Sequence, residues 1–140
     1  MTYLLDTTAV SEWVKPRPDP GIARWLDEVD EDRTFLSVIT VGELRRGVER
    51  LAAGRRRNDR TRWLDHRLPE RFEGRLLPVG TEVADVWGRL TARLEGRGRK
   101  VGAMDTLIAA TAEHHRLRVV TRNVTDFEPT GVVVVNPWTG

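Results

Sequence analysis

The sequence predicts an α/β domain in which a central sheet of five parallel strands lies between two layers of helices, a three-layer α/β/α architecture. Short apolar segments alternate along the chain with longer segments whose apolar residues recur at helical spacing. The first apolar segment, Tyr3-Leu4-Leu5, has the unbroken apolar character of a central strand covered on both faces. The last, Val132–Val135, consists of valine alone and is expected to be a buried strand. Right-handed crossovers through helices join strands arranged in this way.

The first part of the chain predicts a strand, two helices and a second strand. The first strand ends at Asp6, and residues 8–14 are expected to form a short helix. Residues 16–21 are rich in proline and end in glycine, which indicates a turn. Apolar residues then recur at helical spacing, so a helix is expected over 22–30, and residues 34–38 form the second predicted strand.

The middle of the chain predicts two helices and a third strand. Apolar residues from Val41 to Leu51 define one face of a helix that Gly54 ends. Residues 55–72 are expected to form one further helix, and residues 75–79 a third short strand. The inward side chains of the 55–72 helix are expected to be Trp63, Leu64, Leu68 and Phe72.

The last part of the chain completes the alternation. A clear apolar stripe predicts a helix over residues 83–96. Residues 96–102 form a basic, glycine-rich loop that lacks the spacing of a phosphate-binding P-loop. A helix is expected over 103–115, followed by strands at 118–121 and 132–135. One face of the 103–115 helix is expected to carry Met104, Leu107, Ile108 and Thr111.

Length and composition limit the class of protein. With 140 residues, the chain is most simply one domain over 1–140, large enough to bury a core. It contains no cysteine, so disulfides, thiolate metal sites and a cysteine nucleophile are excluded. No apolar run approaches the roughly 20 residues that span a bilayer. We therefore expect a cytoplasmic protein without a membrane partner.

Charge is unevenly distributed along the chain. Residues 1–44 have a net charge of −5, residues 45–75 of +6 and residues 76–140 of +1. The basic middle segment carries eleven arginines and five acidic residues, and 21 of the 23 basic residues of the chain are arginine. Guanidinium groups suit phosphate recognition, although a run of charges is often only a solvated face.

Acidic residues fall where the predicted strands end. Asp6 ends the first strand, and Glu43 lies near the start of the helix after the second strand. Asp105 lies in the first turn of the 103–115 helix, and Asn123 and Asp126 follow the fourth strand. Because loops after parallel strands emerge at one edge of a sheet, Asp6, Glu43 and the 123–126 loop are expected to meet there. Asp105 joins them if its helix starts at that edge.

Each acidic residue also has a purely structural interpretation. Asp6 can cap the following helix, and Glu43 can be a solvated helix residue. Asp105 is placed to interact with a helix dipole, and Asp126 can be a turn residue.

A cluster of these carboxylates would have a definite chemistry. Two unit charges about 4 Å apart repel by roughly 4 kcal/mol at an effective dielectric near 20, so a cluster binds protons or a cation. Oxygen ligands alone select Mg²⁺ or Mn²⁺, and carboxylate-held Mg²⁺ is suited to phosphodiester hydrolysis. A histidine base is not expected, since His66 lies among arginines and His114 and His115 lie at a helix end.

Four segments, in order, resemble the motifs of PIN-domain ribonucleases, and in particular the VapC toxins of bacterial type II toxin–antitoxin pairs. The third segment is the most specific, and the end of the chain, 134–138, is similar to the FitB-like branch. The four segments are Leu4-Leu5-Asp6-Thr7, Val41-Gly42-Glu43-Leu44, residues 103–112 and residues 120–127.

The resemblance implies a PIN-like fold and a Mg²⁺-dependent endoribonuclease acting on an RNA substrate. It also implies a VapB-like antitoxin as inhibitor, a homodimer, and a toxin–antitoxin hetero-oligomer. Metal-binding and catalytic roles carry over to Asp6, Glu43 and Asp105. Many members have an acid where this chain has Asn123, so either Asn123 or Asp126 is expected to complete the site.

Two other functions are compatible with these residues. One is a catalytically weak PIN-like module that binds RNA or a partner, which the Asn123 departure favours. The other is a phosphoacceptor domain with Asp6 as nucleophile, but Thr8 stands where a second acid is needed.

Overall fold

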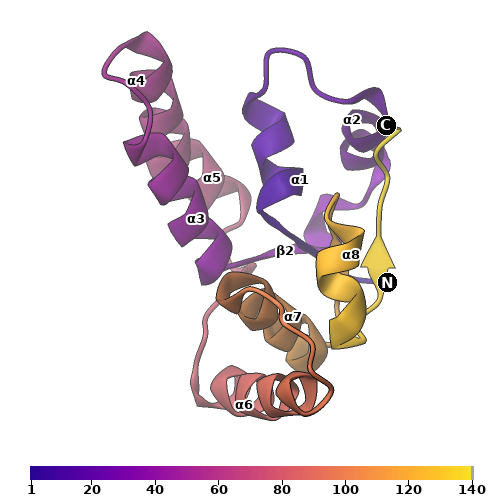
Figure 1. Ribbon diagram of the computed structural model, residues 1–140. Helices are drawn as coiled ribbons and strands as arrows, with labels where there is room; N and C mark the ends of the chain where they lie inside the picture. The colour runs from indigo at the N-terminus through magenta and orange to yellow at the C-terminus, as the bar shows by residue number, and fades with distance from the viewer. Residues whose placement is uncertain (140) are drawn as a thin grey trace.

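A computed structural model describes residues 1–139 and confirms the predicted α/β architecture (Figure 1). All strand pairs are parallel, and the strand order across the sheet is β3-β2-β1-β4-β5. The strands are β1 (Tyr3–Leu5), β2 (Thr34–Ser37), β3 (Leu76–Leu77), β4 (Arg118–Val120) and β5 (Val134–Val135). The central position of β1 agrees with its apolar sequence, because both of its faces are covered.

The strand order places a topological switch point between β1 and β4. The chain builds outward from β1 through β2 to β3, and then returns to the other side of β1 to form β4 and β5. Leu5 pairs with Val120, so the residues that follow these two strands emerge side by side. In open α/β sheets, ligands bind outside the carboxyl ends of the strands at this point.

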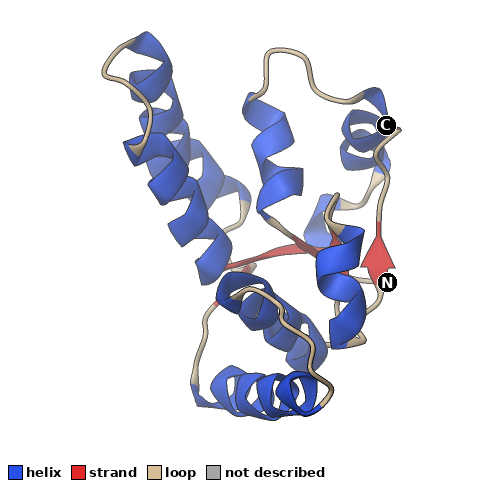
Figure 2. Cartoon of the chain, viewed as in Figure 1, coloured by secondary structure: helices blue, strands red, loops and turns tan. Residues whose placement is uncertain are grey.

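Helices cover both faces of the sheet, as Figure 2 shows. On one face, Leu5 and Val120 pack with side chains of α1 (Thr7–Ser11), α2 (Pro20–Glu28), α3 (Val38–Glu49) and α5 (Leu68–Arg71). On the other face, Leu4 and Val119 pack with side chains of α6 (Thr81–Gly96), α7 (Ala103–His115) and α8 (Val124–Phe127). Successive strand residues therefore face opposite layers.

Two predicted helices are less regular than expected. The first helix is α1 followed by a 3₁₀ turn, η1 (Glu12–Val14), and further 3₁₀ turns occur at η2 (Glu31–Arg33) and η4 (Glu128–Thr130). The predicted 55–72 helix consists of α4 (Arg55–Arg62), a π-helical turn η3 (Trp63–Arg67) and α5. Pro69 explains this change, since proline has no N–H and its ring clashes with the carbonyl four residues earlier.

The prediction of a fully buried fifth strand is wrong. Only Val134 and Val135 pair as β5, both are half-buried, and Val133 is 54% exposed. The third strand is likewise shorter than 75–79, and Leu76 in it is exposed. Both strands lie at the edges of the sheet, where the helical layers cover them incompletely.

Met104, which its spacing assigns to the same helix face as Ile108 and Thr111, has a side chain that is 41% exposed. The buried residues of α7 begin at Thr106 and continue from Ile108 to Ala112. The first turn of α7 therefore lies beyond the buried apolar side chains, near the carboxyl ends of the strands. Asp105 belongs to this turn.

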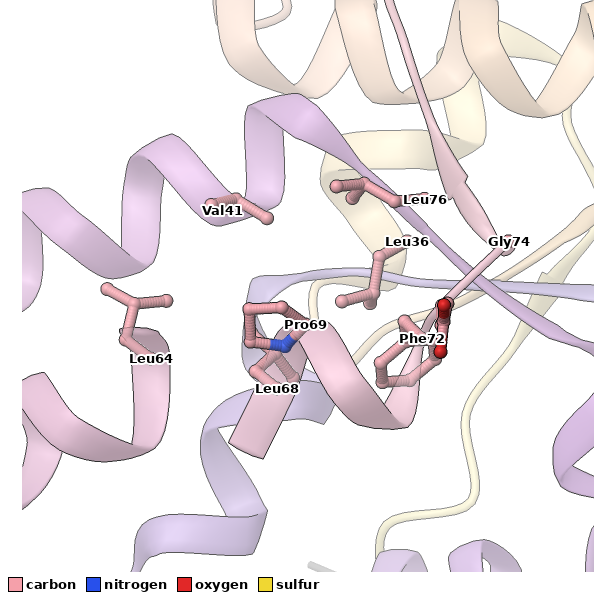
Figure 3. A pocket seen from close by; sticks show the side chains of 9 residues that line it. Leu36, Val41, Leu64, Leu68, Pro69, Phe72, Gly74 and Leu76 are labelled. Atoms are coloured by element: carbon pink, nitrogen blue, oxygen red, sulfur yellow. The ribbon is translucent and has the colours of Figure 1, made fainter. Parts of the chain in front are cut away.

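The β3 side of the sheet contains an apolar hollow of about 220 Å³ (Figure 3). Residues of α3, η3, α5 and β3 line it, and Glu73 is the one charged residue among them. This hollow does not hold the predicted acidic residues.

Over residues 1–139, no helix is both long and apolar enough to cross a membrane.

Candidate functional site

Asp6 follows β1 directly and is almost completely buried, with 3% of its surface exposed. Its N–H donates to the carbonyl of Val120, which continues the β1–β4 pairing by one residue. Its Oδ1 accepts hydrogen bonds from Thr8 Oγ1 at 2.6 Å and from the N–H of Ala9 at 3.1 Å. Its Oδ2 accepts a hydrogen bond from Thr121 Oγ1. Asp6 therefore does cap α1, and capping is not an alternative to membership of the site.

Two threonine hydroxyls orient the Asp6 carboxylate. The backbone N–H of Arg122 donates to Thr8 Oγ1 at 3.2 Å, and the N–H of Asn123 donates to Thr121 Oγ1 at 3.0 Å. Because each hydroxyl has one proton, accepting these bonds leaves that proton for Asp6. Sequence reasoning missed Thr121 in this role. The available signal was position, since Thr121 follows β4 as Asp6 follows β1.

Glu43 lies in α3 and is connected to the same turn. Its Oε1 accepts a hydrogen bond from Thr7 Oγ1 at 2.6 Å, and Thr7 is the residue after Asp6. The helices α1 and α3 pack against each other. The half-buried Glu43 carboxylate is therefore held beside the carboxyl end of β1.

Asp105 is half-buried in the first turn of α7, and the other acidic residues influence it. Burial, followed by the charges of Asp126, Glu43 and Asp6, raises the pKa of Asp105 from 3.8 to about 6. The packing of α7 against α3 and α8 brings these groups together. The structure thus confirms that the helix of Asp105 starts at the edge where the strand ends meet.

A hydrogen-bond network fixes the start of α7. Trp87 of α6 donates from Nε1 to Thr106 Oγ1 at 3.0 Å, and that hydroxyl donates to the carbonyls of Ala103 and Gly102. Thr106 is buried, and it adjoins Asp105 in the sequence. The position of Asp105 is therefore set by packing between α6 and α7.

The two candidates for the fourth position differ in their surroundings. Asn123 is exposed and contributes its backbone N–H to the threonine network, and its side chain does not cap α8. Asp126 is exposed in α8, and its charge is the largest electrostatic contribution to the raised pKa of Asp105. Of the two side chains, Asp126 is the one whose charge acts on Asp105.

The ion pairs formed within residues 1–139 by lysine, histidine and the arginines other than Arg122 all go to acidic residues outside this site. Burial raises the pKa of Asp6, while its hydrogen bonds to Thr121, Thr8 and Ala9 oppose this rise. The four carboxylates therefore concentrate negative charge at this edge of the sheet.

A hard divalent cation fits this set of oxygen donors. In the described part of the chain, no three acidic or histidine side chains are arranged to hold an ion entirely by themselves. Mg²⁺ does not require that, because it commonly keeps several water ligands and binds through one or two carboxylates. The donor chemistry agrees with Mg²⁺ or Mn²⁺ and excludes a thiolate site, since the chain has no cysteine.

Comparison with known proteins connects this site to a family. The PIN domain family matches residues 3–129. The chain is 38% identical to the Toxin FitB of Neisseria gonorrhoeae, over 96% of this chain and 97% of that protein. It is 36% identical to the VapC ribonuclease Y4jK of Sinorhizobium fredii, over 96% of both chains. The crystal structure of FitAcB from Neisseria gonorrhoeae superimposes with a TM-score of 0.93 at 37% identity, covering 99% of this chain and 100% of that one. Other solved structures similar to this chain are toxin–antitoxin complexes of the VapBC type.

Proposed function

The chain belongs to the PIN-domain family of nucleases, and we propose that it is a Mg²⁺-dependent endoribonuclease that hydrolyses RNA phosphodiester bonds. The observation that carries this proposal is the convergence of four carboxylates at the β1–β4 switch point. A site of this composition attracts a divalent cation and, through it, a phosphate group.

We assign the metal-binding and catalytic roles to Asp6, Glu43, Asp105 and Asp126. Asp6 is supported by its burial and by its threonine donors, which favour the ionised carboxylate. Asp126 is preferred to Asn123 as the fourth group because its charge acts on Asp105. Asn123 then serves through its backbone N–H, which orients Thr121.

The chemistry follows from this arrangement. When bound, a divalent ion lowers the pKa of water and stabilises the charge on the phosphoryl oxygens. The chain contributes anionic oxygens on rigid supports, because Asp6 continues the central strand and Glu43 and Asp105 belong to packed helices. Nine of the eleven arginines of residues 45–75 lie on α3, α4, η3 and α5. The helices α3, α4 and α5 extend together from the sheet (Figure 1). These arginines are placed to hold the RNA backbone.

We further propose that the protein is the toxin of a toxin–antitoxin pair in the cytoplasm. The names of its relatives, Toxin FitB and VapC ribonuclease, support this proposal. Its partners would be a VapB-like antitoxin and a second copy of the chain, which together form a hetero-oligomer. The RNA substrate, the homodimer and the antitoxin are inferences from the family.

Metal dependence tests the proposed function directly. The purified protein should cut a labelled RNA in Mg²⁺, stop in excess EDTA, and resume when Mg²⁺ or Mn²⁺ is added back. Cleavage is measured on a denaturing gel. Equal cleavage with and without EDTA would contradict the proposal.

A non-catalytic module that binds RNA or a partner is the second candidate, and the amide at Asn123 favours it. It predicts that RNA is retained in a mobility-shift assay while the same RNA stays intact in Mg²⁺. The two measurements on one sample separate the candidates.

Replacing Thr121 with valine should reduce cleavage without unfolding the protein. Valine keeps the shape of threonine but removes the donor to Asp6 Oδ2. Groups that orient a metal ligand typically contribute about 10–100-fold to metal affinity or activity, so we expect a loss in that range and a higher Mg²⁺ concentration for half-maximal rate. Thr111→Val is the matched control, because the Thr111 hydroxyl donates to the Leu107 carbonyl within its own helix. An equal effect of both substitutions would show a general packing defect.

A further inference from the structure

A second charged site lies near the amino end of β4, whereas the acidic residues lie at the carboxyl ends of the strands. A hollow of about 420 Å³ opens near the beginning of β4, between the end of α7 and the turn before β5. Its lining includes Arg93 of α6, Arg116 at the end of α7 and Arg118 of β4. Glu113 is the one acidic residue in the lining. We call this hollow the arginine pocket.

The three arginines of this pocket have no internal role as ion-pair partners. Across the described residues, 1–139, none of their guanidinium groups forms a hydrogen bond or an ion pair. By contrast, Arg89, one turn before Arg93 in α6, pairs with Asp85 at 3.2 Å. Three cations from separate elements repel one another unless an anion lies between them. The pocket therefore has a net attraction for an anionic ligand.

The backbone of Arg116 is a second, independent observation. Its φ of 57° and ψ of 46° are left-handed, and within residues 1–139 it is the one non-glycine residue with positive φ. Glycine is favoured at this position after a helix, because a side chain there is disfavoured sterically. Unfavourable backbone conformations of this kind concentrate at binding sites. Arg116 is one of the residues that line the arginine pocket.

We propose that the arginine pocket binds a phosphate group. Guanidinium forks bind phosphate oxygens in pairs, which suits three arginines around one hollow. The volume lies within the roughly 300–1,000 Å³ typical of small-ligand sites. The phosphate comes either from an RNA backbone or from a small free phosphate compound. The proposal does not depend on nuclease activity, since the pocket and the acidic site lie at opposite edges.

Nuclear magnetic resonance tests the proposal with two probes. ¹⁵N-labelled protein carrying Asp6→Asn, which is expected to leave RNA intact, is titrated with inorganic pyrophosphate and separately with a short single-stranded RNA. The test variant combines Arg93→Gln with Arg116→Gly. Glycine suits the left-handed backbone and glutamine is a good helix former, so this variant is expected to fold. Arg89→Gln is the matched control, because it removes a guanidinium group from the same helix outside the pocket lining.

The expected result is a shift of the arginine Nε–Hε signals of the pocket and of the amides of residues 130–133. Affinity for the probe that shifts these signals should fall at least about tenfold in the double variant and stay unchanged in Arg89→Gln. A response to RNA alone identifies the backbone as the source, and a response to pyrophosphate identifies a small phosphate compound. The proposal is overturned if neither probe shifts these signals, or if the double variant binds as well as the control. Unchanged spectra elsewhere show that the double variant is folded.

Discussion

Replacing Asp6 with asparagine is expected to abolish RNA cleavage, with a rate loss of at least about 10³-fold, as for a residue that acts in the transition state. Asparagine retains a side-chain oxygen for the Ala9 N–H, and it is as good a helix cap as aspartate. It loses the negative charge, and the amide N–H₂ that replaces Oδ2 cannot accept the hydrogen bond from Thr121. The variant should therefore fold but fail to cut RNA in Mg²⁺.

Asp19→Asn provides the matched control for this prediction. Asp19 caps α2 by accepting from the N–H groups of Gly21 and Ile22, as Asp6 caps α1. It is bonded to Thr139 and takes no part in the acid cluster. We expect full cleavage by Asp19→Asn on the same gel. Cleavage by Asp6→Asn at the wild-type rate would show that Asp6 serves only as a cap.

Replacing Asp105 with asparagine is expected to remove activity while leaving the protein at least as stable as the wild type. Burial, followed by the charges of its acidic neighbours, raises the pKa of Asp105, so its charge is unfavourable in the absence of metal. A pKa raised from 3.8 to about 6 corresponds to roughly 3 kcal/mol, which solvent screening at this half-buried position reduces to about 1–2 kcal/mol. The melting temperature in EDTA should rise by about 3–6 °C.

The pH dependence of this stability difference has a definite sign. Because the folded-state pKa is the higher one, protonated Asp105 favours the folded state below pH 3.8, and this contribution is lost as the pH rises through about 6. Asparagine resembles the protonated carboxyl. The variant and the wild type should therefore be equally stable near pH 4, and the advantage of the variant should grow up to pH 7.

Urea unfolding in EDTA at pH 4.5 and pH 7.5 measures this difference. Asp85→Asn is the control, since Asp85 is exposed and pairs with Arg89 on the surface of α6. The free energy of unfolding of Asp85→Asn, relative to the wild type, should not increase from pH 4.5 to pH 7.5 as that of Asp105→Asn does. A clear loss of stability in Asp105→Asn at pH 7.5 would instead assign Asp105 a structural role.

The acidic site was predicted in large part because its residues follow predicted elements. Asp6 stands after a short, unbroken apolar segment, and Asp105 stands at the start of a regular helix. Parallel strands present their carboxyl ends at one edge, so placing the strands also placed Asp6, whereas the edge at which the helix of Asp105 starts stayed open. Asp6 caps α1 through Oδ1 and accepts from Thr121 through Oδ2, so its capping role does not exclude a role in the proposed site.

The local pattern of apolar residues did not predict burial correctly where burial depends on the position of a residue relative to the sheet. Four consecutive valines predict a strand, but strand order decides whether both faces are covered, and β5 lies at an edge. Met104 matches the helical period of α7, yet that helix begins beyond the apolar layer and leaves the side chain exposed.

The sequence by itself determined the alternation of strands and helices, the placement of Asp6 and Glu43 near the ends of the first two strands, and the basic character of residues 45–75. Periodicity encodes these features because it reports local conformation and the face that each residue shares. Only the tertiary structure decided that Thr121 donates to Asp6, 115 residues away. It also decided that Asp126 acts on Asp105 and that three arginines line one pocket. These contacts depend on strand order, register and helix packing, and residues so distant in sequence leave no local pattern that reveals their proximity.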